Sequence, residues 1–347
     1  MQRKTYYSLL FLIFLSTSLQ SPHFVAAAVT DDTPKIQIFT SVGLLQDFVH
    51  NVGGDLVELT SILVEGTEDP HTYEPTQSDI TALINADMFF LLGRPGLEPW
   101  WAGYKDIILP DNPYLNITTV MNDSMVQVDP LLGTENPHGW MSPLIAKEMV
   151  KNVYLGLSEQ IDPADGDELT QNYHNYIEQL DALIGHLEAN RSKYEGLKVV
   201  VHHPSFMYLL DFLGIERIGV IEEQHEVEPS PQHIQTIKDL MVAENCTTLI
   251  SQANLDKDVI LQLARDTNAS IIWGVPLLGM DGSNGQPIET YIEMIEYNIW
   301  ALDNPETPDA ESSNIAGIPA FWMGLGFLIP IGLIFFNILE KRPVSRK

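Results

Sequence analysis

Three histidines of this chain stand where their imidazoles could act together on a metal ion. His71 follows an Asp-Pro pair, His138 follows an Asn-Pro pair, and His203 comes just after the apolar run Val199–Val201. A neutral imidazole is the commonest protein ligand for zinc, with Zn–N distances of about 2.0–2.1 Å. Three imidazoles leave one position of a tetrahedron to fill. The residue types therefore indicate a zinc site, on condition that the fold brings the three segments together.

The other histidines give no such indication. A single histidine in a loop is more often a surface or hydrogen-bonding residue than a ligand, so each needs a supporting context. At this stage His202, directly before His203, is an alternative for the third position. We interpret the remaining histidines as signal-segment or surface residues: His23, His50, His174, His186, His225 and His233.

The histidines must be positioned by a chain in which strand and helix patterns alternate. Such alternation favours parallel sheets flanked by helices, an α/β fold. A long polar helical pattern over 167–194, with apolar residues near the 3.6-residue period, separates two alternating halves. We therefore predict two α/β lobes with parallel β-sheets, joined by one long rigid helix. The predicted strands are 35–39, 56–64, 88–92, 198–201, 218–221, 248–251 and 270–273, and the other helices are 44–52, 77–86, 143–160, 206–213, 231–243, 256–267 and 288–302.

All three histidines fall at the carboxyl ends of predicted strands or in the loops beyond them. Ligands of open parallel sheets bind in the crevice outside those ends. If the two lobes face each other, the three imidazoles can converge in the cleft between them.

The overall charge restricts the partners of the protein. The 347 residues carry 47 Asp and Glu but only 18 Lys and Arg, a formal net charge of −29. Such acidity keeps a surface soluble and repels polyanions, so nucleic acid is excluded as a partner. The single Cys246 excludes an intrachain disulfide and a thiolate metal cluster.

Both ends of the chain have the composition of membrane-directing segments. The start has the charged, apolar and small-residue order of a secretory signal, ending at Ala26–Ala28. Near the other end, the apolar run Ile315–Leu339 is long enough as a helix to cross a ~30 Å hydrocarbon core. The basic tail that follows predicts a cytoplasmic C-terminus by the positive-inside rule. We therefore expect a single-pass protein of the cell membrane with its large domain outside.

These segments together predict the domain organisation. It comprises a signal peptide (1–28), an N-terminal metal-binding lobe (29–165), a linker helix (166–195), a C-terminal lobe (196–302), a tether (303–314), a transmembrane helix (315–339) and a cytoplasmic tail (340–347).

The motifs around the three histidines resemble one known family. Residues 65–76 read EGTEDPHTYEPT, residues 136–143 read NPHGWMSP, and residues 203–208 read HPSFMY. They are similar to the three histidine motifs of the metal-binding solute-binding proteins of zinc and manganese ABC importers. The second motif usually begins Asp-Pro-His in that family, where this chain has Asn136. The resemblance extends over residues 36–302.

The resemblance implies a function for the whole outer domain. It implies that the protein captures a divalent metal between its lobes, with His71, His138 and His203 as ligands, and delivers it to the permease and ATPase of an ABC importer. The spacing of the third motif selects His203 over His202. Histidine at that position is typical of zinc-type members, so Zn²⁺ is favoured as the transported ion and Mn²⁺ is the alternative. We expect the protein to be a monomer.

The fourth ligand departs from the family pattern. The family's aspartate falls on Pro276, which has no coordinating side chain. Asp281, five residues further in a Gly-rich stretch, is our candidate for the fourth ligand. Water and Glu223 are the alternatives. The histidine-rich loop of many zinc-type members is also missing, because Met121–Glu135 contains no histidine.

Two other classes of function compete with metal transport. Three histidines and an open position also describe the zinc centre of a hydrolase, in which the metal lowers the pKa of a bound water to about 7. A hydrolase needs a general base as well, and the nearest acid in sequence, Glu74, lies between Tyr73 and Pro75. A surface adhesin is the second alternative, because some relatives of the family have been regarded as adhesins.

Overall fold

A computed structural model describes residues 35–61, 69–94, 96–223, 227–283 and 285–308 of the chain. The predicted signal peptide, transmembrane helix and cytoplasmic tail lie outside these ranges. No helix within the described ranges is both long enough and apolar enough to cross a bilayer.

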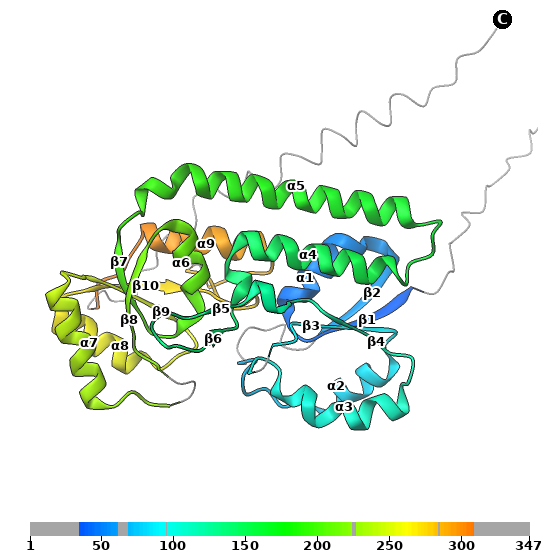
Figure 1. The fold of residues 1–347 in the computed structure, drawn as a ribbon, viewed down its shortest axis with the longest axis horizontal. Helices are drawn as coiled ribbons and strands as arrows, with labels where there is room; N and C mark the ends of the chain where they lie inside the picture. Colours follow the sequence, from blue (N-terminus) through cyan, green and yellow to red (C-terminus); the bar gives the residue numbers. More distant parts are fainter. Residues whose placement is uncertain (1–34, 62–68, 95, 224–226, 284, 309–347) are drawn as a thin grey trace, which may run out of the picture. The chain divides into compact units, whose positions relative to one another are not determined.

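The first lobe is built on a parallel sheet in the order β2-β1-β3-β4. Its strands are β1 (Ile36–Thr40), β2 (Val57–Ser61), β3 (Met88–Leu91) and β4 (Asn116–Thr119). Helices α1 (Gly43–Gly53) and α4 (Pro143–Ser158) cover one face, and α2 (Gln77–Asn85) and α3 (Pro99–Asp111) cover the other (Figure 1).

Side chains alternate across this sheet, as a period of two requires. Ile38, Met88 and Phe90 belong to the core beneath α1 and α4. Phe39 and Phe89 point to the opposite face, where they join the smaller core beneath α2 and α3. Both faces are therefore buried, which is typical of parallel sheets.

The second lobe repeats the design with a parallel sheet in the order β10-β9-β7-β8. Its strands are β7 (Lys198–Val201), β8 (Glu216–Val220), β9 (Thr248–Gln252) and β10 (Ser270–Gly274). Helices α7 (Pro231–Ala243) and α8 (Lys257–Thr267) share one core with this sheet. Helices α6 (Met207–Leu213) and α9 (Tyr291–Asp303) belong to the large core that continues into the first lobe.

The long helix α5 (Gly166–Asn190) runs past both lobes (Figure 1). It packs on α1 and α4 through one apolar stripe that includes Leu169, Tyr176 and Leu180. Asp167 and Glu168 in its first turn complement the positive end of the helix dipole. The predicted fold class, two parallel α/β lobes joined by one long helix, is thereby confirmed, as is the solute-binding protein architecture that the motifs implied.

Several elements were not predicted from the sequence. Helix α3 was missed because its apolar residues do not follow one stripe, and it begins with Pro99 in the first turn and contains Pro110. Strand β4 was missed because its sequence, NITT, is polar and it is only half-buried. The two-residue strands β5 (Gln127–Val128) and β6 (Glu135–Asn136) form a small antiparallel hairpin that also escaped prediction.

The last helix begins three residues later than predicted. Thr290 accepts a hydrogen bond from the backbone of Glu293, whose side chain accepts one from the backbone of Thr290. This capping box fixes the start of α9 at Tyr291. The start predicted at Ile288 was wrong because it followed hydrophobicity rather than the cap.

Candidate metal site

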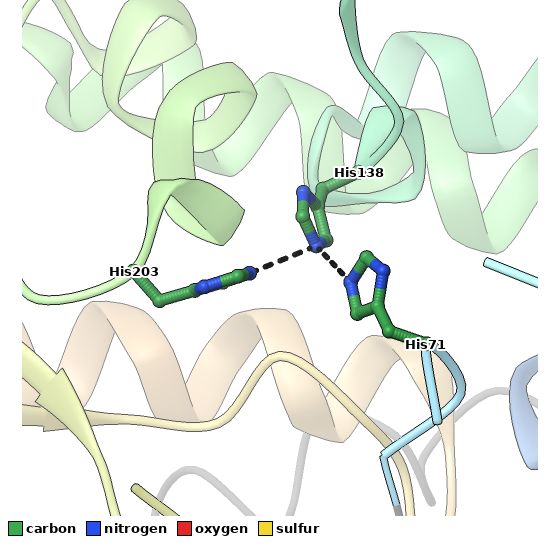
Figure 2. A group of neighbouring side chains, drawn as sticks. All are labelled: His71, His138 and His203. Carbon is green, nitrogen blue, oxygen red and sulfur yellow. Dashed lines mark hydrogen bonds between the residues drawn. The ribbon is translucent and has the colours of Figure 1, made fainter. Parts of the chain in front are cut away.

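The structure brings His71, His138 and His203 together (Figure 2). The Nε2 atom of His138 lies 3.4 Å from Nε2 of His71 and 3.4 Å from Nε2 of His203. Zn–N bonds of about 2.0–2.1 Å give a tetrahedron edges of about 3.3–3.4 Å. The two nitrogen–nitrogen distances therefore match edges of a tetrahedral metal site, and all three ligand atoms lie within 4.8 Å of one another.

His71 belongs to the first lobe and is half-buried. Its backbone N–H donates to the Asp69 carboxylate at 2.9 Å. Its Nδ1 donates to the carbonyl of Gly96 at 2.5 Å. Because a carbonyl only accepts, Nδ1 carries the proton, and the lone pair on Nε2 faces the other two histidines.

The loop that supplies Gly96 is held by a buried carboxylate. Glu98 accepts hydrogen bonds at 2.7 Å from the backbone N–H groups of Leu92 and Gly93, and another from the hydroxyl of Ser41. Burial raises the pKa of Glu98, and these hydrogen bonds oppose the rise. Glu98 thereby fixes the backbone that orients His71.

His138 precedes a 3-10 turn at Gly139–Met141 and is almost fully buried. Its backbone N–H and its Nδ1 both donate to Oδ1 of Asn136, at 3.1 and 2.9 Å. The ring stands edge-on to Trp140 with 5.3 Å between centroids. The indole N–H of Trp140 donates to the carbonyl of Pro276 at 2.8 Å, so a second-lobe loop supports the aromatic wall beside His138.

His203 follows β7, at the carboxyl end of the second sheet. Its Nδ1 lies 2.8 Å from Oε2 of Glu222, which follows the neighbouring strand β8. A carboxylate behind a histidine fixes the ring and makes its other nitrogen a stronger metal donor. The sequence analysis missed Glu222. Its position directly after a predicted strand beside β7 is the signal that could have found it.

His202 and Glu223, the alternatives for the third and the fourth ligand, form hydrogen bonds or ion pairs with other residues. His202 is buried, its Nδ1 lies 2.9 Å from the hydroxyl of Ser251, and burial lowers its pKa. Glu223 lies beside His233, with 3.4 Å between its Oε2 and Nδ1 of the ring. Neither residue belongs to the group that the three imidazoles form among the described residues.

Asp281 does not join the three histidines among the described residues. Its side chain is exposed, and its backbone forms an antiparallel bridge with Pro287. Gly282 donates to the carbonyl of Gln286 at 2.9 Å, so Asp281 starts a tight turn. Pro276, at the place of the family's aspartate, is buried and offers its carbonyl to Trp140.

Two α/β lobes on a shared long helix, with histidines from both lobes converging, define the class of two-lobed metal-binding solute-binding proteins. The sequence model of the family described as "ZnuA: Zinc-uptake complex component A periplasmic" matches residues 38–304. The chain belongs to this family.

Relatives of known function carry names that refer to several metals. The chain is 27% identical over 293 residues to the iron-binding protein YfeA of Yersinia pestis, covering 84% of this chain and 93% of the relative. It is 25% identical over 276 residues to the manganese-binding lipoprotein MntA of Halalkalibacterium halodurans, covering 78% and 88%. Both names refer to metal binding, whereas the metal differs between the two relatives.

Solved structures agree on the fold. A crystal structure of ZnuA superimposes with a TM-score of 0.65 at 22% identity and covers 78% of this chain and 99% of its own. A mutant structure of the laminin-binding adhesin Lmb of Streptococcus agalactiae gives a TM-score of 0.65 at 23% identity, covering 77% and 98%. At these identities the likeness establishes the fold only. The ligand must be inferred from the residues of the site.

Proposed function

We propose that this protein captures a divalent transition metal outside the cell, with zinc preferred, and delivers it to the permease and ATPase of an ABC importer. The observation that carries the proposal is the convergence of three imidazoles: Nε2 of His138 lies 3.4 Å from Nε2 of His71 and from Nε2 of His203, and the three ligand atoms all lie within 4.8 Å of one another. In our proposal these nitrogens are three ligands of the transported ion. No covalent chemistry is required of the protein, which acts as a binding component rather than an enzyme.

The donor set supports zinc over manganese. Imidazole nitrogens in tetrahedral arrangement suit zinc, whereas manganese prefers oxygen donors and higher coordination. The three nitrogens leave one position, which we assign to water rather than to Asp281, because the exposed turn at Asp281 does not approach the three imidazoles.

We also propose that the chain is anchored in the cell membrane by 315–339, with the two lobes outside and the basic tail in the cytoplasm. The length and apolarity of this run support the anchor. The manganese-binding relative MntA is named a lipoprotein, so a tethered binding protein also has a precedent among the relatives.

The test is competitive metal titration of the full chain in detergent, with zinc and manganese against a chromophoric chelator. We expect one zinc per chain and weaker binding of manganese. His71→Ala, His138→Ala and His203→Ala should each weaken zinc binding strongly, because the lost imidazole must be replaced by water.

His202→Ala is the matched control, since this histidine is adjacent and equally buried but turned to Ser251. It should leave zinc affinity close to that of the wild type. Wild-type affinity in any of the three ligand variants, or tighter binding of manganese than of zinc, would refute the proposed site or the proposed metal.

A further inference from the structure

The hairpin β5–β6 comes from the first half of the chain but is bound to the second lobe. Tyr208, on α6, accepts a hydrogen bond from the backbone N–H of Gln127 at 2.8 Å. The same hydroxyl donates to the carbonyl of Asn136 at 2.6 Å. One tyrosine thus fixes both strands of the hairpin, and Figure 1 shows them close to α6.

A buried ion pair makes the second connection. Arg217, on β8, donates two hydrogen bonds of 2.9 Å to the two carboxylate oxygens of Asp129, in the hairpin loop. The two side chains are 3% and 1% exposed. Burial raises the pKa of Asp129, but the hydrogen bonds of Arg217 and of the Leu131 backbone outweigh it, and the net shift is downward.

Between this ion pair and the metal site lies the carboxamide of Asn136, which is 2% exposed. Its Oδ1 accepts from the backbone N–H and the Nδ1 of His138. Its Nδ2 donates to the carbonyl of Pro204 at 2.9 Å and faces Oδ2 of Asp129 at 3.3 Å. The oxygen meets two donors and the nitrogen two acceptors, so the orientation of the amide is determined by its partners.

We propose that Asn136 is a positioning residue that holds His138 and His203 as one preformed pair of ligands. This inference rests on the proposed function. Through Oδ1 it keeps the proton of His138 on Nδ1, so that Nε2 offers its lone pair to the ion. Through Nδ2 it ties the same segment to Pro204, the neighbour of His203.

The carboxamide of Asn136 is required at this position because its nitrogen faces two acceptors, the carbonyl of Pro204 and the carboxylate of Asp129. An aspartate, the usual residue of the resembling family, would still accept from His138 and would make the imidazole more basic. It would also remove the donor to Pro204 and place a second carboxylate about 3.3 Å from Asp129, in a buried site where like charges repel strongly. We expect the loss of positioning to exceed the gain in basicity.

The experiment is zinc titration of the full chain carrying Asn136→Asp, with Asn136→Ala for comparison. Changes to residues that orient metal ligands typically lower affinity about 10- to 100-fold, and we expect a loss in this range for both variants. Nitrogen-15 NMR of the zinc-loaded wild type should show the His138 Nδ1 protonated, and in Asn136→Ala this proton should exchange faster with water.

Two further variants separate positioning from general destabilisation. Asn152→Asp is the matched control, because Asn152 also donates to a buried backbone carbonyl, that of Val120, at 2.9 Å. It should leave zinc affinity unchanged. Combining Asn136→Asp with Asp129→Asn moves the carboxylate instead of adding one, and should recover part of the lost affinity.

Asn136→Asp binding zinc within threefold of the wild type would overturn the inference, and so would an equal loss in Asn152→Asp. These outcomes are distinct from failure of the proposed function. In that case His138→Ala and His203→Ala would themselves leave zinc binding intact.

Discussion

Asp47 offers the sharpest test of how the lobes and the long helix are joined. This α1 carboxylate is buried and accepts hydrogen bonds from the hydroxyl of Tyr176 on α5, at 2.8 Å, and from the backbone N–H of Tyr291 at the start of α9, at 3.1 Å. Asn51 donates to its other oxygen at 3.0 Å. Asp47 therefore links both lobes and the long helix at one point.

Burial raises the pKa of Asp47 from 3.8 to about 6, although the hydrogen bonds from Tyr176, Tyr291 and Asn51 and the attraction of His50 lower it. At about 1.36 kcal/mol per pKa unit, this difference corresponds to about 3 kcal/mol. The folded state binds the proton more tightly than the unfolded chain does. The resulting stability is fully present below pH 3.8 and is lost as the pH rises through about 6.

The perturbation is Asp47→Asn, which removes the titration and keeps an oxygen that can accept from Tyr176 and Tyr291. When the pH rises from 5 to 7.5, the deprotonation of Asp47 alone should lower the free energy of unfolding by about 1.4 kcal/mol. Urea unfolding of the metal-free protein at both pH values measures the difference. The pH dependence of the wild type should exceed that of Asp47→Asn by this amount.

Burial also raises the pKa of Glu98, Asp211 and Glu296, so only the difference between variants is informative. Asp55→Asn is the control for the removal of one carboxylate, because the side chain of Asp55 is fully exposed, and it is unfolded in urea at the same two pH values. Identical pH dependence in the wild type and in Asp47→Asn would show that burial does not perturb this carboxyl as we reason.

Three further predictions concern the surroundings of the site. Arg217→Met leaves a buried carboxylate unpaired and should lower the free energy of unfolding by about 3–5 kcal/mol in urea titrations. Trp140→Phe removes the donor to the buried carbonyl of Pro276 and should lower the free energy of unfolding by about 1–3 kcal/mol. Zinc affinity, measured by chelator competition, should change only slightly. Glu222→Gln removes the charge behind His203 and should weaken zinc binding about tenfold, measured by the same competition, without a comparable loss of stability.

The periodicity of the sequence was sufficient to predict the main elements. Both halves alternate between apolar strands and amphipathic helices, and the long helix has its own apolar stripe, because burial of one face imposes these periods locally. Elements that lack such a signal were missed, as α3 and β4 show. The boundary of α9 depended on the capping pair Thr290 and Glu293, which a hydrophobic pattern does not reveal.

The sequence by itself determined which histidines to consider, since each stands in a short motif whose residues are neighbours along the chain. Only the tertiary structure decided how those histidines are held. His138 donates hydrogen bonds to Asn136, and Asn136 donates to Pro204 and to Asp129. Asp129 in turn accepts from Arg217, which is 88 positions further along the chain. Contacts across such separations leave no local pattern. They arise because the fold packs the hairpin β5–β6 against α6 and β8, which are far from the hairpin in the sequence.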